Sequence, residues 1–138
     1  MAAANDSTRA VAAPGTARPA PATLPLSDCQ MAVMLAFGLS FGEFTGNGRA
    51  LRAARARHCF CWLAGIATTA EPKEIGRRIN RGRNAVSYGA DFVNRYAGAA
   101  ALRAEILARL DVDQPCAGEL VGFGRRLEDL TKPTDMEG

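Results

Sequence analysis

The stretch 71–95, EPKEIGRRINRGRNAVSYGADFVNR, decides the fold that we predict for this chain. Residues 71–79 begin Glu-Pro and are predicted as a short helix, because proline is tolerated in the first helical turn. The glycine-containing basic turn 80–83 follows, and a longer helix is predicted over about residues 84–97. A short helix, a tight turn and a second helix with an apolar inner face are typical of a helix-turn-helix.

The helix predicted over residues 84–97 has two chemically different faces. Its apolar residues recur at helical spacing and are expected to face the core: Val86, Gly89, Ala90 and Val93, joined by Tyr88, Phe92 and Tyr96. Its polar residues recur at i, i+3, i+7 and i+11 and form one stripe: Asn84, Ser87, Asp91 and Arg95. A polar stripe of this kind suits a helix that reads bases in the major groove of DNA.

The segments on either side of this unit are also predicted as helices. The aromatic content is only 7%, which suits a helical protein better than a β-sandwich. The predicted helices cover about residues 27–38, 50–68, 99–110 and 116–130, with a glycine-marked turn at 41–48. The longest of them is expected to bury one stripe: Leu51, Ala54, His58, Cys59, Trp62, Leu63 and Ile66. We therefore predict an all-α, multi-helix fold.

Three regions of the chain differ in composition. Residues 1–25 are rich in Ala and Pro and carry few large apolar side chains, so a disordered tail is predicted. Residues 26–110 form the predicted helix-turn-helix domain. Residues 111–138 form a C-terminal extension whose amphipathic pattern either docks on the domain or pairs with another copy. A homodimer through the N- or C-terminal helices is accordingly one expectation.

Positive charge is concentrated in the middle of the chain. The formal net charge is +3, but residues 49–95 hold ten basic residues against three acidic ones, a net charge of +7. Such clustering predicts a polyanionic partner. Arg49, Arg52, Arg55 and Arg57 crowd the start of the longest helix, where the helix dipole disfavours cations, which suggests a functional role. A solvated basic face is the alternative.

Several function classes are disfavoured by the sequence. The strongest apolar run, 31–39, is shorter than the roughly 20 residues that span a bilayer, so no membrane association is expected. The sequence 58–61, HCFC, lacks a second cluster for a four-ligand zinc site, so no metal is predicted. The sequence contains no phosphate-binding glycine loop and no motif of a nucleophile–base pair, so no nucleotide, no cofactor and no enzymatic activity are predicted. Without a signal peptide or a disulfide framework, a cytoplasmic, nucleoid-associated location is expected.

Residues 26–110 resemble the C-terminal DNA-binding domain of the bacterial replication initiator DnaA. Residues 54–58, ARARH, stand where that family has Ala-Arg-Pro-Arg-Gln, and residues 74–76, EIG, match its Pro-Glu-Ile-Gly. Residues 82–88, GRNAVSY, stand at its Gly-Arg-Asp-His-Ser/Thr-Thr-Val, after one extra residue near Arg81. The resemblance implies a Trp-repressor-like helix-turn-helix fold that binds double-stranded DNA.

The resemblance also implies roles for single residues. Arg49 matches an arginine that enters the minor groove, and two arginines of the following helix, Arg55 and Arg57, match groups that bind phosphates or bases. Arg83 matches the arginine that opens the recognition helix, and Asn84 stands where the family has Asp. The next two family residues, His and Ser/Thr, are replaced here by Ala85 and Val86, so a different DNA target is expected. The chain has no Walker loop, so ATP binding and origin melting are not assigned.

We therefore predict sequence-specific binding of double-stranded DNA by a regulator of transcription or replication. Basic groups would position the protein on the phosphates, while Asn84, Ser87 and Asp91 would read base edges and Val86 a thymine methyl. The predicted contact residues are Arg49, Arg55, Arg57, Lys73, Arg77, Arg81, Arg83, Asn84, Ala85, Val86 and Ser87. The alternative is a protein-interaction module that derives from such a domain and has lost base readout. The replaced histidine favours this alternative, whereas the retained arginine cluster favours DNA.

Overall fold

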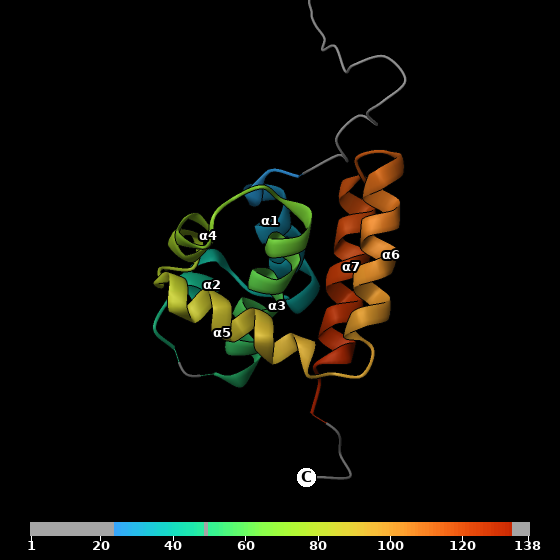
Figure 1. Ribbon diagram of the computed structural model, residues 1–138. Coiled ribbons are helices and arrows are strands. Elements are labelled where there is room, and N and C mark those ends of the chain that lie inside the picture. The colour runs from blue at the N-terminus through green and yellow to red at the C-terminus, as the bar shows by residue number, and fades with distance from the viewer. Residues whose placement is uncertain (1–23, 49, 134–138) are drawn as a thin grey trace, which may run out of the picture.

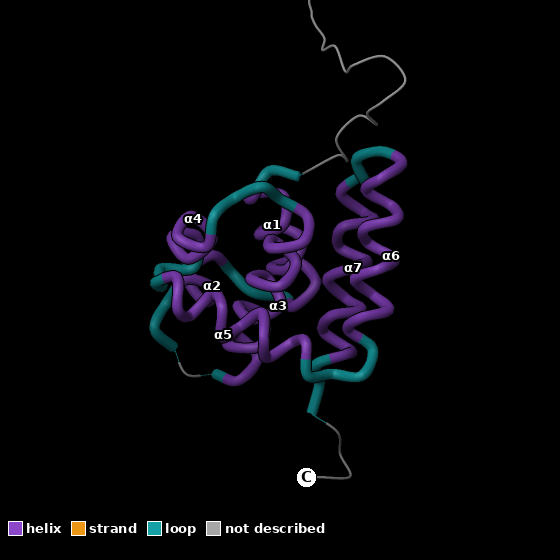
Figure 2. The backbone as a smooth tube through the Cα atoms, viewed as in Figure 1, coloured by secondary structure: helices purple, strands orange, loops and turns teal. Residues whose placement is uncertain are grey.

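The computed structural model describes residues 24–48 and 50–133. Every helix or strand found in these residues is an α-helix, so the predicted all-α class is confirmed (Figures 1 and 2). The helices are α1 (Leu26–Phe37), α2 (Phe41–Thr45), α3 (Leu51–Ala67), α4 (Pro72–Arg78), α5 (Arg83–Asn94), α6 (Ala99–Val112) and α7 (Ala117–Leu130). The predicted tail, apart from its last two residues, and Arg49 lie outside the described residues. None of the described helices is long and apolar enough to cross a bilayer.

Helix α3 lies at the centre of the fold and contacts the other six helices. Six consecutive residues of α3, numbers 59–64, are buried, so this part of the helix has no face toward solvent. The prediction of a single buried stripe was therefore wrong. Leu51, which was assigned to that stripe, is 75% exposed, because it stands at the start of α3 before the helix enters the core.

The region 41–48 was predicted as a turn, but its first five residues form α2. The physical reason is a capping box. The Ser40 side chain accepts a hydrogen bond from the Glu43 N–H at 3.1 Å, and the Glu43 carboxylate accepts one from the Ser40 N–H at 2.8 Å. Phe44 is buried edge-on against Phe60 of α3, which fixes this short helix to the core.

The C-terminal extension contributes a core helix. Helix α7 packs along α1, and α6 runs antiparallel beside α7 (Figure 1). The ion pairs Arg109–Glu119 and Arg126–Glu105 join α6 to α7. A Cβ added at Gly124 would lie 2.8 Å from the Cβ of Ala36, so this glycine permits the close approach of α7 to α1. Of the two arrangements expected for this extension, docking on the rest of the domain is the one present in this single chain.

Candidate nucleic-acid interface

A short, tightly held turn joins α4 to α5. Helix α4 begins at a capping box in which the Glu74 carboxylate accepts a hydrogen bond from the Glu71 N–H at 3.0 Å. The chain then reverses at Asn80, whose φ of 59° lies in the left-handed region that asparagine tolerates better than most residues. The Arg81 N–H donates to the Gly76 carbonyl at 2.8 Å, which folds the turn back onto α4.

Helix α5 is seated on α3 by its apolar face. Val86 and Val93 are buried, and a Cβ at Gly89 would lie 3.1 Å from the Cα of His58. The two helices therefore approach closely at this glycine, which fixes the rotation of α5 about its own axis. This seating turns the opposite face of α5 toward solvent.

The predicted polar stripe of α5 lies at the surface. Asn84, Ser87, Asp91 and Arg95 are all exposed. Tyr88 is exposed as well, although its position in the sequence pattern placed it with the inward-facing residues. Its ring lies edge-on to His58 at the border of the buried face, with 5.5 Å between ring centroids. The outward face of α5 therefore carries one aromatic ring beside its polar groups.

Three cations accompany this polar face. Arg83 occupies the first position of α5 and is exposed. Lys73 and Arg77 are exposed at i and i+4 on α4, the helix that precedes the turn. None of the three has an ion-pair partner among residues 24–48 and 50–133. Their charges are therefore available to a ligand.

The arginines of α3 have a different role from the one predicted for them. Arg55 donates through Nη2 to the Glu128 carbonyl at 2.7 Å and through Nε to the Thr131 carbonyl at 3.0 Å. These carbonyls belong to the C-terminal end of α7, where helical partners are missing and a cation is favoured by the helix dipole. Arg52 likewise bonds the Phe37 carbonyl and pairs with Glu128. Arg55 thus holds α7 to α3.

Arg57 is a core residue with only 7% of its surface exposed. Its guanidinium donates to four backbone carbonyls in the segment 43–48, which includes α2 and the loop after it: those of Glu43, Phe44, Gly46 and Gly48, at 3.1–3.5 Å. The prediction that Arg57 contacts DNA was therefore wrong, because its donors are consumed inside the protein.

Three further predicted contacts also point partly or wholly inward. Arg81 is partly buried and donates to the Ile79, Asn80 and Gly46 carbonyls, which ties the turn to the loop after α2. Ala85 lines a pocket of about 180 Å³ between α3 and the turn. Val86 is only 4% exposed, so the prediction that it touches a thymine methyl was wrong. A side chain that faces inward from α5 cannot also reach the major groove of DNA.

His58 packs between α3 and α5 with an unpaired ring nitrogen. Its ring lies 4.6 Å from that of Phe92, and its buried Nδ1 has no hydrogen-bond partner. Burial and, secondarily, the Arg57 charge lower the pKa of His58 below its ordinary value of 6.5. The imidazole is therefore held neutral at physiological pH as part of the α3–α5 contact.

Stability is expected to fall as the pH is lowered through the range in which His58 titrates. The pKa of folded His58 lies below 6.5, so the unfolded chain takes up the proton first as the pH decreases. The contribution of the neutral imidazole is therefore complete above that value and is lost progressively below it. We expect a lower urea midpoint at about pH 5 than at about pH 7.5.

Two features allow the loss of stability at low pH to be attributed to His58. It is the only histidine in the chain, so its NMR titration reports the folded pKa directly. The carboxylates whose pKa is lowered, Glu43, Glu105 and Glu119, titrate below their ordinary value of 4.5 and stay ionised over this range. His58→Phe should abolish the midpoint difference. Equal urea midpoints for the wild-type protein at both pH values would contradict the claim that the buried neutral imidazole of His58 stabilises the fold.

No family model, curated protein or solved structure matches this chain. The resemblance of residues 26–110 to the DnaA domain therefore stays a prediction. Residues 24–48 and 50–133 form an all-helical fold that exposes the polar face of α5 and, on α4 and α5, three cations without an ion-pair partner among these residues.

Proposed function

We propose that the protein binds double-stranded DNA by placing α5 in the major groove. The single observation that supports this most strongly is the outward polar edge of α5, which starts at Arg83 and is accompanied by Lys73 and Arg77 of α4. A helix of twelve residues is about 18 Å long, and the major groove, about 12 Å wide, admits it. The proposal makes the protein a nucleoid-associated regulator of transcription or replication.

Phosphate contacts and base contacts fall to different residues of this surface. Lys73, Arg77 and Arg83 would neutralise phosphates and fix the register of the protein on the duplex. Asn84 and Ser87 lie on the first turns of α5, where a recognition helix meets base edges. Asn pairs well with adenine, and the Asp91 carboxylate would accept a hydrogen bond from the cytosine amino group.

The salt dependence of DNA binding distinguishes the α4–α5 surface from a larger interface that would use all the basic residues of 49–95. Each neutralised phosphate contributes about −0.9 to the slope of log K against log salt concentration. Lys73, Arg77 and Arg83 alone predict a slope near −3, and a further phosphate contact by Arg95 of the polar stripe would make it about −3.6. Phosphate contacts by all the arginines of residues 49–95 would give a much steeper slope. In the structure, however, Arg52, Arg55, Arg57 and Arg81 form hydrogen bonds inside the protein.

Arg83→Ala should weaken binding about tenfold on every duplex, because it removes a phosphate contact that carries no sequence information. The measurement is fluorescence anisotropy with genomic fragments selected for binding, at two salt concentrations. Arg103→Ala is the matched control, since Arg103 is exposed on α6, away from the proposed surface, and should not alter affinity. Unchanged affinity for Arg83→Ala would remove Arg83 from the interface.

Asn84→Ala should relax specificity and leave non-specific affinity nearly unchanged. Loss of one bidentate base contact corresponds to about 1–3 kcal/mol of discrimination at a single base pair. A binding competition against duplexes mutated at each position reads this out. The proposal of base readout by α5 fails if the variant ranks all sequences as the wild type does.

A protein-interaction module is the second candidate function. The internal commitment of the α3 arginines favours it, because a structural need for these residues explains their retention without DNA. A folded protein that shifts no duplex in a gel at low salt would support this candidate over DNA binding.

A further inference from the structure

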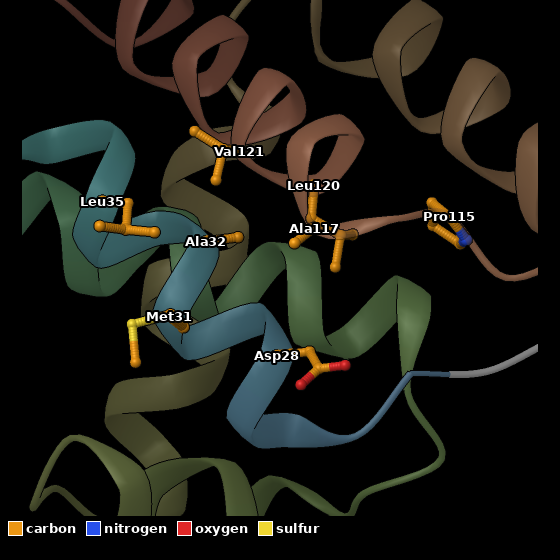
Figure 3. A pocket seen from close by; sticks show the side chains of 8 residues that line it. All are labelled: Asp28, Met31, Ala32, Leu35, Pro115, Ala117, Leu120 and Val121. Atoms are coloured by element: carbon orange, nitrogen blue, oxygen red, sulfur yellow. The ribbon is translucent and has the colours of Figure 1, made fainter.

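A second surface of the molecule is apolar and lies between α1 and the first half of α7. Its centre is a groove of about 140 Å³ lined mostly by aliphatic side chains (Figure 3). Met31 and Leu35 of α1 stand at its edge and are 54% and 59% exposed. On the other side of the groove lie Ala117 and Val121 of α7. Large aliphatic groups on a half-buried helix are typical of a surface that is covered by a partner.

Opposite charges stand at the two ends of this groove. Asp28 lines one end together with Pro115 at the start of α7. The other end is where Gly124 of α7 meets Ala36 of α1, and Arg125 follows directly. Arg125 is exposed and comes four residues after Val121, on the same side of α7.

Neither end charge is neutralised within the part of the chain that the structure describes. Asp28 and Arg125 have no ion-pair partner there. The neighbouring charges on α7 differ in this respect, since Glu119, Arg126 and Glu128 are all paired. An aspartate at one end and an arginine at the other make the groove complementary to a reversed copy of itself.

We infer that this groove is the contact surface of a homodimer with two-fold symmetry. In an antiparallel pairing, Met31 and Leu35 of the two copies face each other across the axis. The same rotation brings Asp28 of one copy to the end of the groove where Arg125 of the other lies. Such an isologous contact buries the aliphatic edge and pairs the two charges twice.

The dimer surface and α5 lie on different sides of α3. Helix α1 packs on α3, and so does α5, while α7 packs chiefly on α1. Pairing through the α1–α7 groove therefore leaves the outward face of α5 uncovered. Dimerisation does not depend on the proposed DNA contacts, and each is measured separately.

Sedimentation velocity of the full chain, from low micromolar to submillimolar concentration, tests the surface. The wild type should show a reversible monomer–dimer equilibrium, and Leu35→Glu should stay monomeric. Val112→Glu is the matched control, because Val112 is 80% exposed but lies at the end of α6, outside the groove. Circular dichroism would verify that each variant is folded. A wild type that stays monomeric throughout overturns the inference, including the case in which the groove binds a different protein.

The charge pair tests the antiparallel geometry. Asp28→Arg and Arg125→Asp should each weaken dimerisation about tenfold, which corresponds to about 1.4 kcal/mol. The double variant restores both attractions with reversed sign and should dimerise nearly as the wild type does. Double-variant association no stronger than that of either single variant would exclude this pairing. Binding of a DNA fragment by monomeric Leu35→Glu reports on the α5 surface alone.

Discussion

Replacing Arg57 with alanine is expected to lower the free energy of unfolding by about 3 kcal/mol. The side chain is almost fully buried, and its guanidinium is the shared donor for the carbonyls of Glu43, Phe44, Gly46 and Gly48. Hydrogen bonds from a charged donor are stronger than neutral ones, and carbonyls left buried without a donor are costly. Urea denaturation followed by circular dichroism measures the loss.

Arg57→Lys provides the matched control. Lysine keeps the charge but lacks the planar fork of donors, so it should bond fewer of the four carbonyls and recover only part of the lost stability. A stability within about 0.5 kcal/mol of wild type for Arg57→Ala would contradict the structural role. That outcome would instead suit a surface arginine whose loss affects only ligand binding.

Gly76→Ala is expected to destabilise the fold by about 2 kcal/mol and to weaken DNA binding as well. The added Cβ would lie 2.5 Å from the Arg81 carbonyl oxygen and 3.2 Å from that of Gly82. Both are backbone atoms of the turn, so the clash is relieved only if the turn moves, and the start of α5 moves with it. Urea denaturation measures the first effect, and anisotropy with a bound DNA fragment measures the second.

Gly65→Ala is the control for the helix propensity of alanine. Gly65 lies inside α3 and is exposed, and a Cβ there meets nothing within 4 Å. The substitution should therefore stabilise the protein by about 0.5–1 kcal/mol, the usual gain from replacing a helical glycine. If Gly76→Ala were neutral or stabilising like Gly65→Ala, the close packing of the turn against α4 would be refuted.

Helical periodicity predicted most of the fold, because a helix that is buried on one face has apolar residues at regular spacing in the sequence. It located α5 and assigned Val86, Gly89 and Val93 to its buried side. It failed for α3, whose middle is buried all around and therefore carries no stripe. It also missed α2, because the glycines of that segment predict a turn, whereas the Ser40-x-x-Glu43 capping box begins a helix.

The candidate site was harder to predict than the fold, because a count of charges does not reveal their partners. Arg55 and Arg57 bond backbone carbonyls, and because every residue carries such a carbonyl, the residue types of the sequence do not mark the acceptors. The Arg55 acceptors lie more than 70 residues away along the chain, and no local pattern marks them. By contrast, Arg83 and the polar stripe of α5 follow from position on a helix, and the structure places them at the surface.

One carbonyl oxygen has a consequence for how this chain tolerates change. The Gly46 carbonyl accepts from Arg57 of α3 and from Arg81 of the turn before α5, at 3.5 and 2.9 Å. An exposed glycine-rich loop is ordinarily a safe place to insert a tag or a fused domain. Here an insertion would displace the Gly46 carbonyl, so that Arg57 and Arg81 would both lose an acceptor and the turn before α5 would be held less firmly.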